Sequence, residues 1–240
     1  MLYLISIGLW SIKDISLNGL EAIEKCDVIY FENYTSYYDS NLNDIKKITK
    51  NDKIIAIKRE ELENNSKKII LEAKEKNIGI LVIGEALAAT THNALIIEAK
   101  ENKVKTKIIH SSSIFTAISE TGLSLYSFGK ITSLPFNYKD LNTPYNILLE
   151  NKDLHTLILL DLEPENKKYM LAKEAIEYFI KKGLDKEKLC IICASLGSEK
   201  QNIIIGKAKE LVNNTLKNIP QCLIIPGKLH FIEQEFLSLY

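Results

Sequence analysis

Short apolar runs alternate with amphipathic segments along the first 110 residues of the chain. The apolar runs have the length of buried strands. They lie at residues 2–7, 27–31, 54–58, 78–83 and 104–110. The amphipathic segments predict helices at residues 18–25, 42–48, 62–76 and 91–101, and Ile69, Ile70 and Ala73 fall on one face of the third. This alternation predicts a mostly parallel sheet with helices on both sides.

The second half of the chain has a different pattern. Strands are expected at residues 131–134, 155–162, 189–194, 203–207 and 222–225. Helices are expected at residues 113–121, 168–182 and 231–239, and Gly122 and Gly183 are placed to end the first two. Several of these strands follow one another through short turns, which favours a mixed sheet. The fold class is therefore α/β with two α/β domains, at residues 1–110 and 111–240.

Composition narrows the possible partners. The 240 residues are 46% hydrophobic and 26% charged, and the formal net charge is zero. A neutral chain does not favour a strongly electrostatic partner, so we expect no nucleic acid and no membrane surface. Arg59 is the only arginine among 31 basic residues. Codon bias in an AT-rich genome explains this most simply, and it leaves the chain almost without bidentate guanidinium groups.

The four cysteines predict buried thiols rather than a metal site. Cys190 and Cys193 have the C-x-x-C spacing but lie within one apolar run, at residues 189–194. Residues three apart on a strand point to opposite faces, so the two thiols could not share a metal or a disulfide. Reduced core cysteines are typical of the cytoplasm. No apolar run reaches membrane-spanning length, and residues 1–7 predict a strand rather than a signal peptide.

The segment VIGEALAATTH, residues 82–92, is the strongest candidate for chemistry; we call it the signature segment. It joins a predicted buried strand to a predicted helix through small residues, and ligands of open α/β sheets bind at the carboxyl ends of strands. The first strand is also followed by a glycine and a polar loop, at residues 7–23. That loop lacks the G-x-G-x-x-G spacing and a Walker loop, so a cofactor bound through pyrophosphate is not indicated.

Two groups of side chains stay open to a structural and a functional interpretation. The four histidines fit no zinc spacing, and structural roles are favoured for each. They are His92, His110, His155 and His230. A group of tyrosines could line a substrate entrance or could simply pack in the core. They are Tyr30, Tyr34, Tyr37 and Tyr38.

Several segments together resemble the diphthine synthases, a branch of the tetrapyrrole-methylase-like methyltransferases. The signature segment is similar to that family's G-D-P-x-x-A-T-T-H. Five further matches follow the family's order over nearly the whole chain: GLWSIKDISLNGLEA at residues 8–22, ENYTS at 32–36, HSSSI with TGL and YSFG between 110 and 129, HTLILLD at 155–161, and PGKLH at 226–230.

The resemblance implies two α/β domains with S-adenosylmethionine in the cleft between them, S-adenosylhomocysteine as its product, and a homodimer. Carried over position by position, it implies cofactor contacts at eight residues: Leu9, Glu85, Ala88, Ser113, Ile114, Leu160, Leu196 and Gln221. Glu85 would be the anion near a cationic cofactor. No catalytic residue and no metal are implied, because methyl transfer from a sulfonium needs a neutral nucleophile held in line with the methyl group.

The implied reaction is methylation of the amino group of a modified histidine on translation elongation factor 2, in the cytoplasm. The archaeal-type ending favours trimethylation over the eukaryotic version, which adds a methyl ester. Two alternatives remain. A porphyrin-precursor methyltransferase would carry G-x-G-P-G-D where this chain has GLWS. A paralogue that only binds the elongation factor would have lost the cofactor. Glu85-Ala86 and Ser195 replace the family's Asp-Pro and an arginine, which bears on cofactor affinity.

Overall fold

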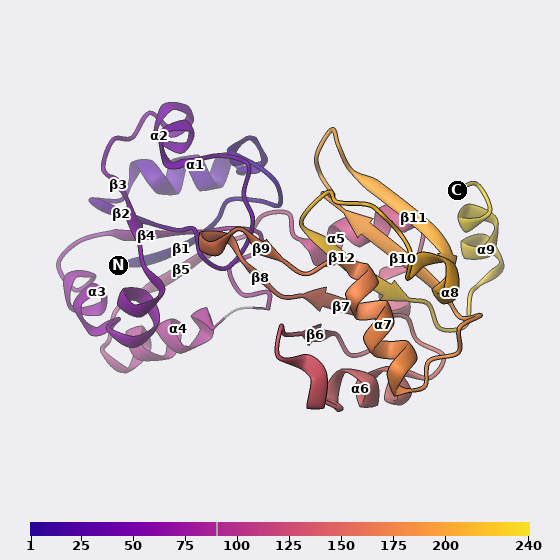
Figure 1. Ribbon diagram of the computed structural model, residues 1–240. Helices are drawn as coiled ribbons and strands as arrows, with labels where there is room; N and C mark the ends of the chain where they lie inside the picture. Colours follow the sequence, from indigo (N-terminus) through magenta and orange to yellow (C-terminus); the bar gives the residue numbers. More distant parts are fainter. Residues whose placement is uncertain (90) are drawn as a thin grey trace. The chain divides into compact units, whose positions relative to one another are not determined.

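The computed structural model describes residues 1–89 and 91–240, which form two compact units (Figure 1). The first unit is Met1–Phe115 and the second is Thr116–Tyr240. The predicted domain boundary, after residue 110, lies a few residues before this division. Each unit is built around a sheet of its own.

The first unit contains a five-stranded parallel sheet, as predicted. Its strands are β1 (Leu2–Ser6), β2 (Val28–Glu32), β3 (Ile54–Ile57), β4 (Ile78–Val82) and β5 (Thr106–Ile109). Their order is β3-β2-β4-β1-β5, and every pair is parallel. All residues of β1 and β4 are buried, as parallel strands covered on both faces require.

Helices cover both faces of this sheet. They are α1 (Leu17–Glu24), α2 (Leu42–Thr49), α3 (Lys67–Glu72) and α4 (His92–Glu101). Helices α1 and α2 lie on one face, and α3 and α4 lie on the other (Figure 1). The loops that follow the neighbouring strands β1 and β4 therefore leave toward opposite faces. Such a switch point opens a crevice at the carboxyl edge of a sheet.

The predicted helix 62–76 is wrong in its first part. A single π-helical turn, η2 (Glu60–Asn64), comes first, with Asn65 N donating to Glu60 O at 3.1 Å. Helix α3 begins only at Lys67. The intervening Asn-Asn-Ser run explains the break, because these side chains compete with the backbone for hydrogen bonds. Ile69, Ile70 and Ala73 are all buried, so the predicted apolar face is confirmed.

The second unit contains the predicted mixed sheet. Its strands are β6 (Thr132–Leu134), β7 (Thr156–Leu160), β10 (Leu189–Ala194), β11 (Asn202–Lys207) and β12 (Gln221–Ile225). Their order is β11-β10-β12-β7-β6, and only β6 and β7 are parallel. Three helices contribute to the core on one face: α6 (Thr143–Asn151), α7 (Ala172–Lys182) and α8 (Ala208–Leu211).

Several predicted helix and strand boundaries in this unit are wrong because short elements occupy part of the predicted ranges. Helix α7 starts at Ala172, because Lys168–Tyr169 forms strand β9 against β8 (Leu162–Glu163). Strand 155–162 is interrupted at Asp161, whose carboxylate accepts the Phe136 and Leu162 N–H groups. Segment 113–121 is α5 (Ile114–Ala117) followed by the 3₁₀ turn η3 (Ile118–Thr121), and the last helix is α9 (Phe231–Leu237). Helix α6 escaped prediction. Further 3₁₀ turns are η1 (Ile12–Asp14), η4 (Leu125–Ser127), η5 (Tyr138–Asp140) and η6 (Pro164–Asn166).

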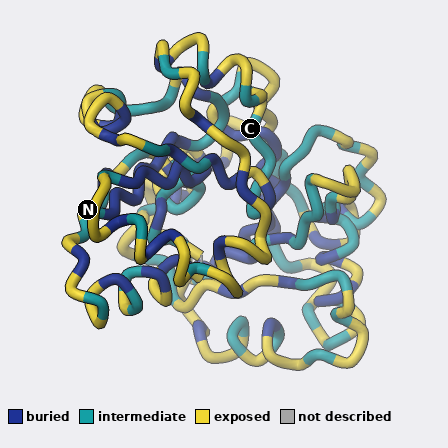
Figure 2. The backbone as a smooth tube through the Cα atoms, turned by 90° about the vertical axis from the view of Figure 1, so that its left-hand side faces the viewer, coloured by how far each residue is buried: buried dark blue, intermediate teal, exposed yellow. Residues whose placement is uncertain are grey.

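Buried residues concentrate on the strands of each unit, and exposed ones on the outer helix faces and loops (Figure 2). The cysteine prediction is confirmed. All four thiols are free and buried. Cys190 packs in the core formed with α7, whereas Cys193 lies opposite Cys222 of β12. Burial raises the pKa of Cys26 and of Cys190 to about 12, which makes both thiols poor nucleophiles.

Candidate active site

The candidate site lies at the carboxyl edge of the parallel sheet, where the loops after β1 and β4 meet. Gly84 N donates to Gly8 O at 2.8 Å and joins the two loops. Both glycines have positive φ, +88° and +74° for Gly8 and Gly84. A Cβ on Gly8 would stand 2.3 Å from Asp14 Cβ, whereas a Cβ on Gly84 would meet nothing within 4 Å. The Gly84 backbone thus borders open space, which lets a ligand approach the main chain.

Asp14 fixes the shape of the first loop. Its Oδ2 accepts the N–H groups of Trp10, at 2.7 Å, and Ser11, at 2.9 Å. Leu9 lies between Gly8 and Trp10, and its N–H donates to Ser112 Oγ at 3.3 Å. Asp14 lies in the family-like segment at residues 8–22, but it was not predicted to act in the site. The turn geometry that gives it this role appears only in the folded loop.

Glu85 links the signature segment to the segment that follows β5. Its two carboxylate oxygens contact His110 Nδ1, at 2.9 Å, and Ser111 N, at 3.0 Å. Ala88 N donates to Glu85 O at 3.0 Å and turns the segment back. The next residues along the chain are Ser113, whose Oγ accepts the Phe115 N–H at 3.2 Å, and Ile114, the first residue of α5. The five expected cofactor residues of the first unit thus lie on loops that are bonded to one another.

A buried polar cluster beneath the signature segment was not predicted as functional. Ala86 N donates to Ser6 Oγ at 2.9 Å, and Ala86 O lies 3.3 Å from His92 Nδ1. His92 Nε2 in turn lies 3.6 Å from Glu32 Oε2. Glu32 and His92 are both buried, and burial raises the pKa of the Glu32 carboxyl. Glu32 Oε1 accepts the N–H and hydroxyl of Thr35, at 3.0 and 2.6 Å, so the loop after β2 joins the cluster.

The second unit brings its three expected residues to one end of three adjacent strands. Leu160 ends β7, Gln221 starts β12, and Leu196 follows β10. The Gln221 side chain is already engaged: Oε1 accepts Ala172 N at 2.8 Å, and Nε2 donates to the carbonyls of Leu216 and Asn218. Any cofactor contact of Gln221 would therefore use its backbone or require this clamp to open.

Ser195 shows what replaced the family's arginine. It has a positive φ of +51°, and its Oγ donates to Ile219 O at 2.7 Å. The residue is buried and ties the loop after β10 to the segment before β12. A short hydroxyl in this position contributes structure to the loop but no positive charge.

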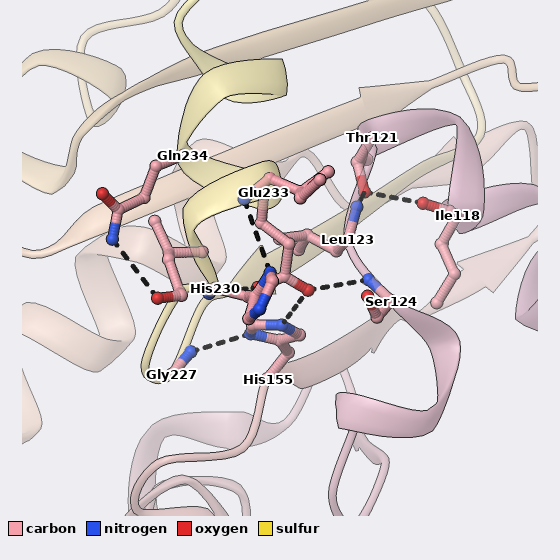
Figure 3. A network of polar contacts seen from close by, with 11 residues as sticks. Ile118, Thr121, Leu123, Ser124, His155, Gly227, His230, Glu233 and Gln234 are labelled. Atoms are coloured by element: carbon pink, nitrogen blue, oxygen red, sulfur yellow. Dashed lines mark hydrogen bonds and ion pairs between the residues drawn. The ribbon is translucent and has the colours of Figure 1, made fainter.

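His155 and Glu233 form a second buried pair, in the other unit (Figure 3). Gly227 N donates to His155 Nδ1 at 3.0 Å, so the ring proton of a neutral imidazole lies on Nε2, which contacts Glu233 Oε1 at 3.2 Å. Glu233 also accepts the N–H groups of Ser124 and His230. Burial opposes ionisation of Glu233, yet these hydrogen bonds together hold its pKa below the ordinary value. The network fastens α9 to the sheet, which is a structural role for His155.

Residues 1–89 and 91–240 contain neither a metal-binding cluster nor a membrane-spanning helix. No group of three or more His, Cys, Asp or Glu side chains there is arranged to hold a metal ion. No helix in the same residues is long and apolar enough to cross a membrane.

Comparison with known proteins identifies the family of the chain. Residues 1–212 match the family described as Tetrapyrrole (Corrin/Porphyrin) Methylases. The diphthine synthases of Methanocaldococcus jannaschii and Methanococcus maripaludis (strain C6) are 37% and 36% identical to it, each over 99% of this chain and 98% of the relative. A crystal structure of a diphthine synthase superposes with a TM-score of 0.93 at 34% identity, covering all of this chain and 95% of that one.

Proposed function

The chain belongs to the tetrapyrrole methylase family, and we propose that it acts as a diphthine synthase. It is an S-adenosylmethionine-dependent methyltransferase, and its substrate is the amino group of a modified histidine on translation elongation factor 2. The observation that carries this proposal is the carboxyl edge of the parallel sheet, where two bonded loops leave the Gly84 backbone beside open space. Relatives that cover nearly the whole chain support the same activity.

The residues at this edge suit S-adenosylmethionine. An adenine and a thioether need apolar walls and a few backbone groups, and the loops offer Leu9, Ala88 and Ile114. Glu85 and Asp14 are the carboxylates of these loops, and both already hold loop N–H groups. Leu160, Leu196 and Gln221 of the second unit are the further cofactor residues that we propose. When bound, the cofactor supplies a methyl group activated by a positively charged sulfur.

The protein's own contribution is to orient the reactants and exclude water. Methyl transfer to an amine requires the amine to be neutral and in line with the methyl–sulfur bond. Ala86 is buried and its N–H is held by the buried Ser6 hydroxyl, which fixes the backbone at this edge for that alignment. The proton of a charged amine can leave to solvent before the reactants are enclosed, so a dedicated base is not required.

Methylation of the protein substrate is the direct test. Elongation factor 2 that carries the unmethylated precursor is incubated with the protein and S-adenosylmethionine, and the mass of the modified residue is measured. We expect three added methyl groups. A fourth would indicate the eukaryotic version with its methyl ester, and an unchanged mass would reject the proposal. Reaction with a porphyrin precursor instead would favour the other branch of the family.

Cofactor binding is tested separately by calorimetry with S-adenosylhomocysteine. We expect the wild-type chain to bind, and we expect Glu85→Ala to weaken binding by about tenfold, because the Ser111 N–H would lose its charged acceptor. Glu85→Asp, which restores the family's residue, is the matched control and should bind at least as well as wild type. A wild-type chain that binds no ligand but still binds elongation factor 2 would be a non-catalytic paralogue.

The remaining expectations follow from the same function. We propose a cytoplasmic location because the substrate belongs to the translation machinery, and a homodimer because the resemblance to the family implies one. Sedimentation or light scattering at micromolar protein gives the oligomeric state directly.

A further inference from the structure

Arg59 is the only arginine in the chain, and it stands at the carboxyl end of β3. Strand β3 pairs with β2, and β2 pairs with β4, which leads into the signature segment (Figure 1). Neighbouring strands lie about 4.8 Å apart, so the end of β3 is about 10 Å from the end of β4 along the same edge. Arg59 thus belongs to the edge on which the candidate site is built.

The guanidinium of Arg59 is held in place but remains largely available. Its Cζ lies 5.0 Å from the centre of the Tyr34 ring, and its side chain is 61% exposed. Within the described residues its only ion pair runs from Nε to Glu63 at 3.9 Å. The terminal nitrogens of the fork are therefore open to a ligand. Stacking on an aromatic ring is a common way to orient such a fork for a carboxylate.

Stability alone does not account for an arginine at this position. The ion pair and the cation–π contact of a largely exposed cation each contribute little, and a lysine would supply much the same. Every other basic residue of the chain is a lysine. What lysine cannot supply is a planar group with two parallel donors, and that is the property needed to bind a carboxylate in a defined orientation.

The surroundings of Arg59 also favour a ligand-binding role. The π-helical turn η2 begins directly after it, and such turns are rare and frequent at functional sites. Among residues 1–89 and 91–240, the buried Tyr34 hydroxyl and Glu32 Oε2 make no hydrogen bond. Both atoms have polar neighbours, Glu63 for the hydroxyl and His92 Nε2 at 3.6 Å for Glu32, but neither forms a hydrogen bond of normal geometry, so each keeps unused hydrogen-bonding capacity. These two atoms lie between Arg59 and the signature segment in strand order.

We propose that Arg59, stacked on Tyr34, binds a carboxylate of the protein substrate and so orients it for methylation. The inference rests on the proposed function. Glu60, Glu61 and Glu63 surround the guanidinium in sequence and would repel a polyanion, so a single negative charge is favoured over a phosphate backbone. The carboxylate belongs either to the modified histidine side chain or to an acidic residue beside it.

Steady-state kinetics with the modified elongation factor test the proposal. We expect Arg59→Gln to raise KM for the protein by about 10- to 100-fold, the value of a lost charge-assisted hydrogen-bond pair. Arg59→Lys should recover only part of that loss, because it restores the charge without the fork. Lys58→Gln removes the same charge from the adjacent exposed residue and should leave KM unchanged.

Two readouts separate recognition from a structural role. Affinity for S-adenosylhomocysteine and the melting temperature should be the same in Arg59→Gln and wild type. The increase of KM with salt should be weaker in the variant, because one ionic contact is gone. An unchanged KM, equal effects of Arg59→Gln and Lys58→Gln, or a parallel loss of cofactor binding would overturn the proposal. A wild-type enzyme that methylates nothing rejects the proposed function instead, and this result is established first.

Competition identifies which carboxylate is bound. Elongation factor 2 with the unmodified histidine is added as an inhibitor of wild type and of Arg59→Gln. If it inhibits wild type more strongly, the carboxylate lies on the protein surface. If only the modified protein distinguishes the two enzymes, the carboxylate lies on the modified side chain. If neither the unmodified nor the modified protein distinguishes the two enzymes, the proposal is contradicted.

Discussion

Each unit buries one histidine–glutamate pair, and the two pairs differ in how far their polar atoms are satisfied. In the second unit, Glu233 accepts three hydrogen bonds and His155 uses both ring nitrogens. In the first unit, Glu32 Oε2 makes no hydrogen bond within the described residues and lies 3.6 Å from His92 Nε2. A network in which every polar atom is hydrogen-bonded, which we call saturated, fastens a helix. A network beside a ligand-binding edge in which one carboxylate oxygen lacks a hydrogen bond can still accept one.

The largest expected effect on stability comes from substituting Glu233 in the saturated pair. Glu233→Ala leaves the N–H groups of Ser124 and His230 and the His155 ring without their acceptor, so we expect a loss of about 3 kcal/mol of unfolding free energy. Urea denaturation measures this loss. Glu233→Gln keeps one oxygen acceptor and should lose less. If Glu233→Ala costs under about 1 kcal/mol, the network does not fasten α9 as we describe.

Glycines beside the two sites should respond differently. A Cβ on Gly227 would stand 2.1 Å from Asp153 O and push the chain away from His155, so Gly227→Ala should cost about 2 kcal/mol by overpacking. Gly84→Ala meets open space and carries only the strain of a positive φ, about 1 kcal/mol. Thermal melts rank the two variants. The added methyl at Gly84 should nevertheless weaken S-adenosylhomocysteine binding, which Gly227→Ala should spare.

The smallest expected effect is the pH dependence of stability that Glu32 and Glu233 cause. The two glutamates should change stability with opposite signs. The folded pKa of Glu32 is raised above 4.5, so wild type loses stability relative to Glu32→Gln as pH rises from 4.5 through the folded pKa. The folded pKa of Glu233 is lowered, so wild type is more stable than Glu233→Gln above pH 4.5 and loses that advantage as pH falls through the folded pKa.

Urea midpoints between pH 3 and pH 8 test both signs. We expect the Glu32→Gln difference to stay under about 1 kcal/mol, because the amide can still accept from Thr35. If the stability differences for Glu32→Gln and Glu233→Gln change with pH in the same direction, the two pairs are electrostatically alike and the comparison between them fails.

Much of the fold followed from local pattern. Runs of isoleucine, leucine and valine, such as residues 78–83, predicted buried strands, and alternation with amphipathic segments predicted a parallel sheet before a mixed one. Gly122 and Gly183 end their helical segments, as predicted, and both have positive φ. These features depend on residues close in sequence, which is why they could be predicted without tertiary information.

The errors lie where a few side chains or a distant partner override the pattern. The Asn-Asn-Ser run and the π-helical turn divided the expected helix 62–76. Asp161 interrupted the expected strand 155–162 through bonds to Phe136 and Leu162. Helix α6 has a proline in its first turn but little apolar periodicity, and it is stabilised by packing against β6 and β7.

The sequence by itself determined the α/β class, the order of parallel and mixed sheets, the family and the segment that carries the candidate site. Only the tertiary structure decided which side chains meet there. Ser6 reaches Ala86, Asp14 holds the first loop, and Arg59 stacks on Tyr34. Patterns of burial are read from neighbours along the chain. Contacts across 25 to 80 residues depend on strand order and loop geometry, which no short window of sequence encodes.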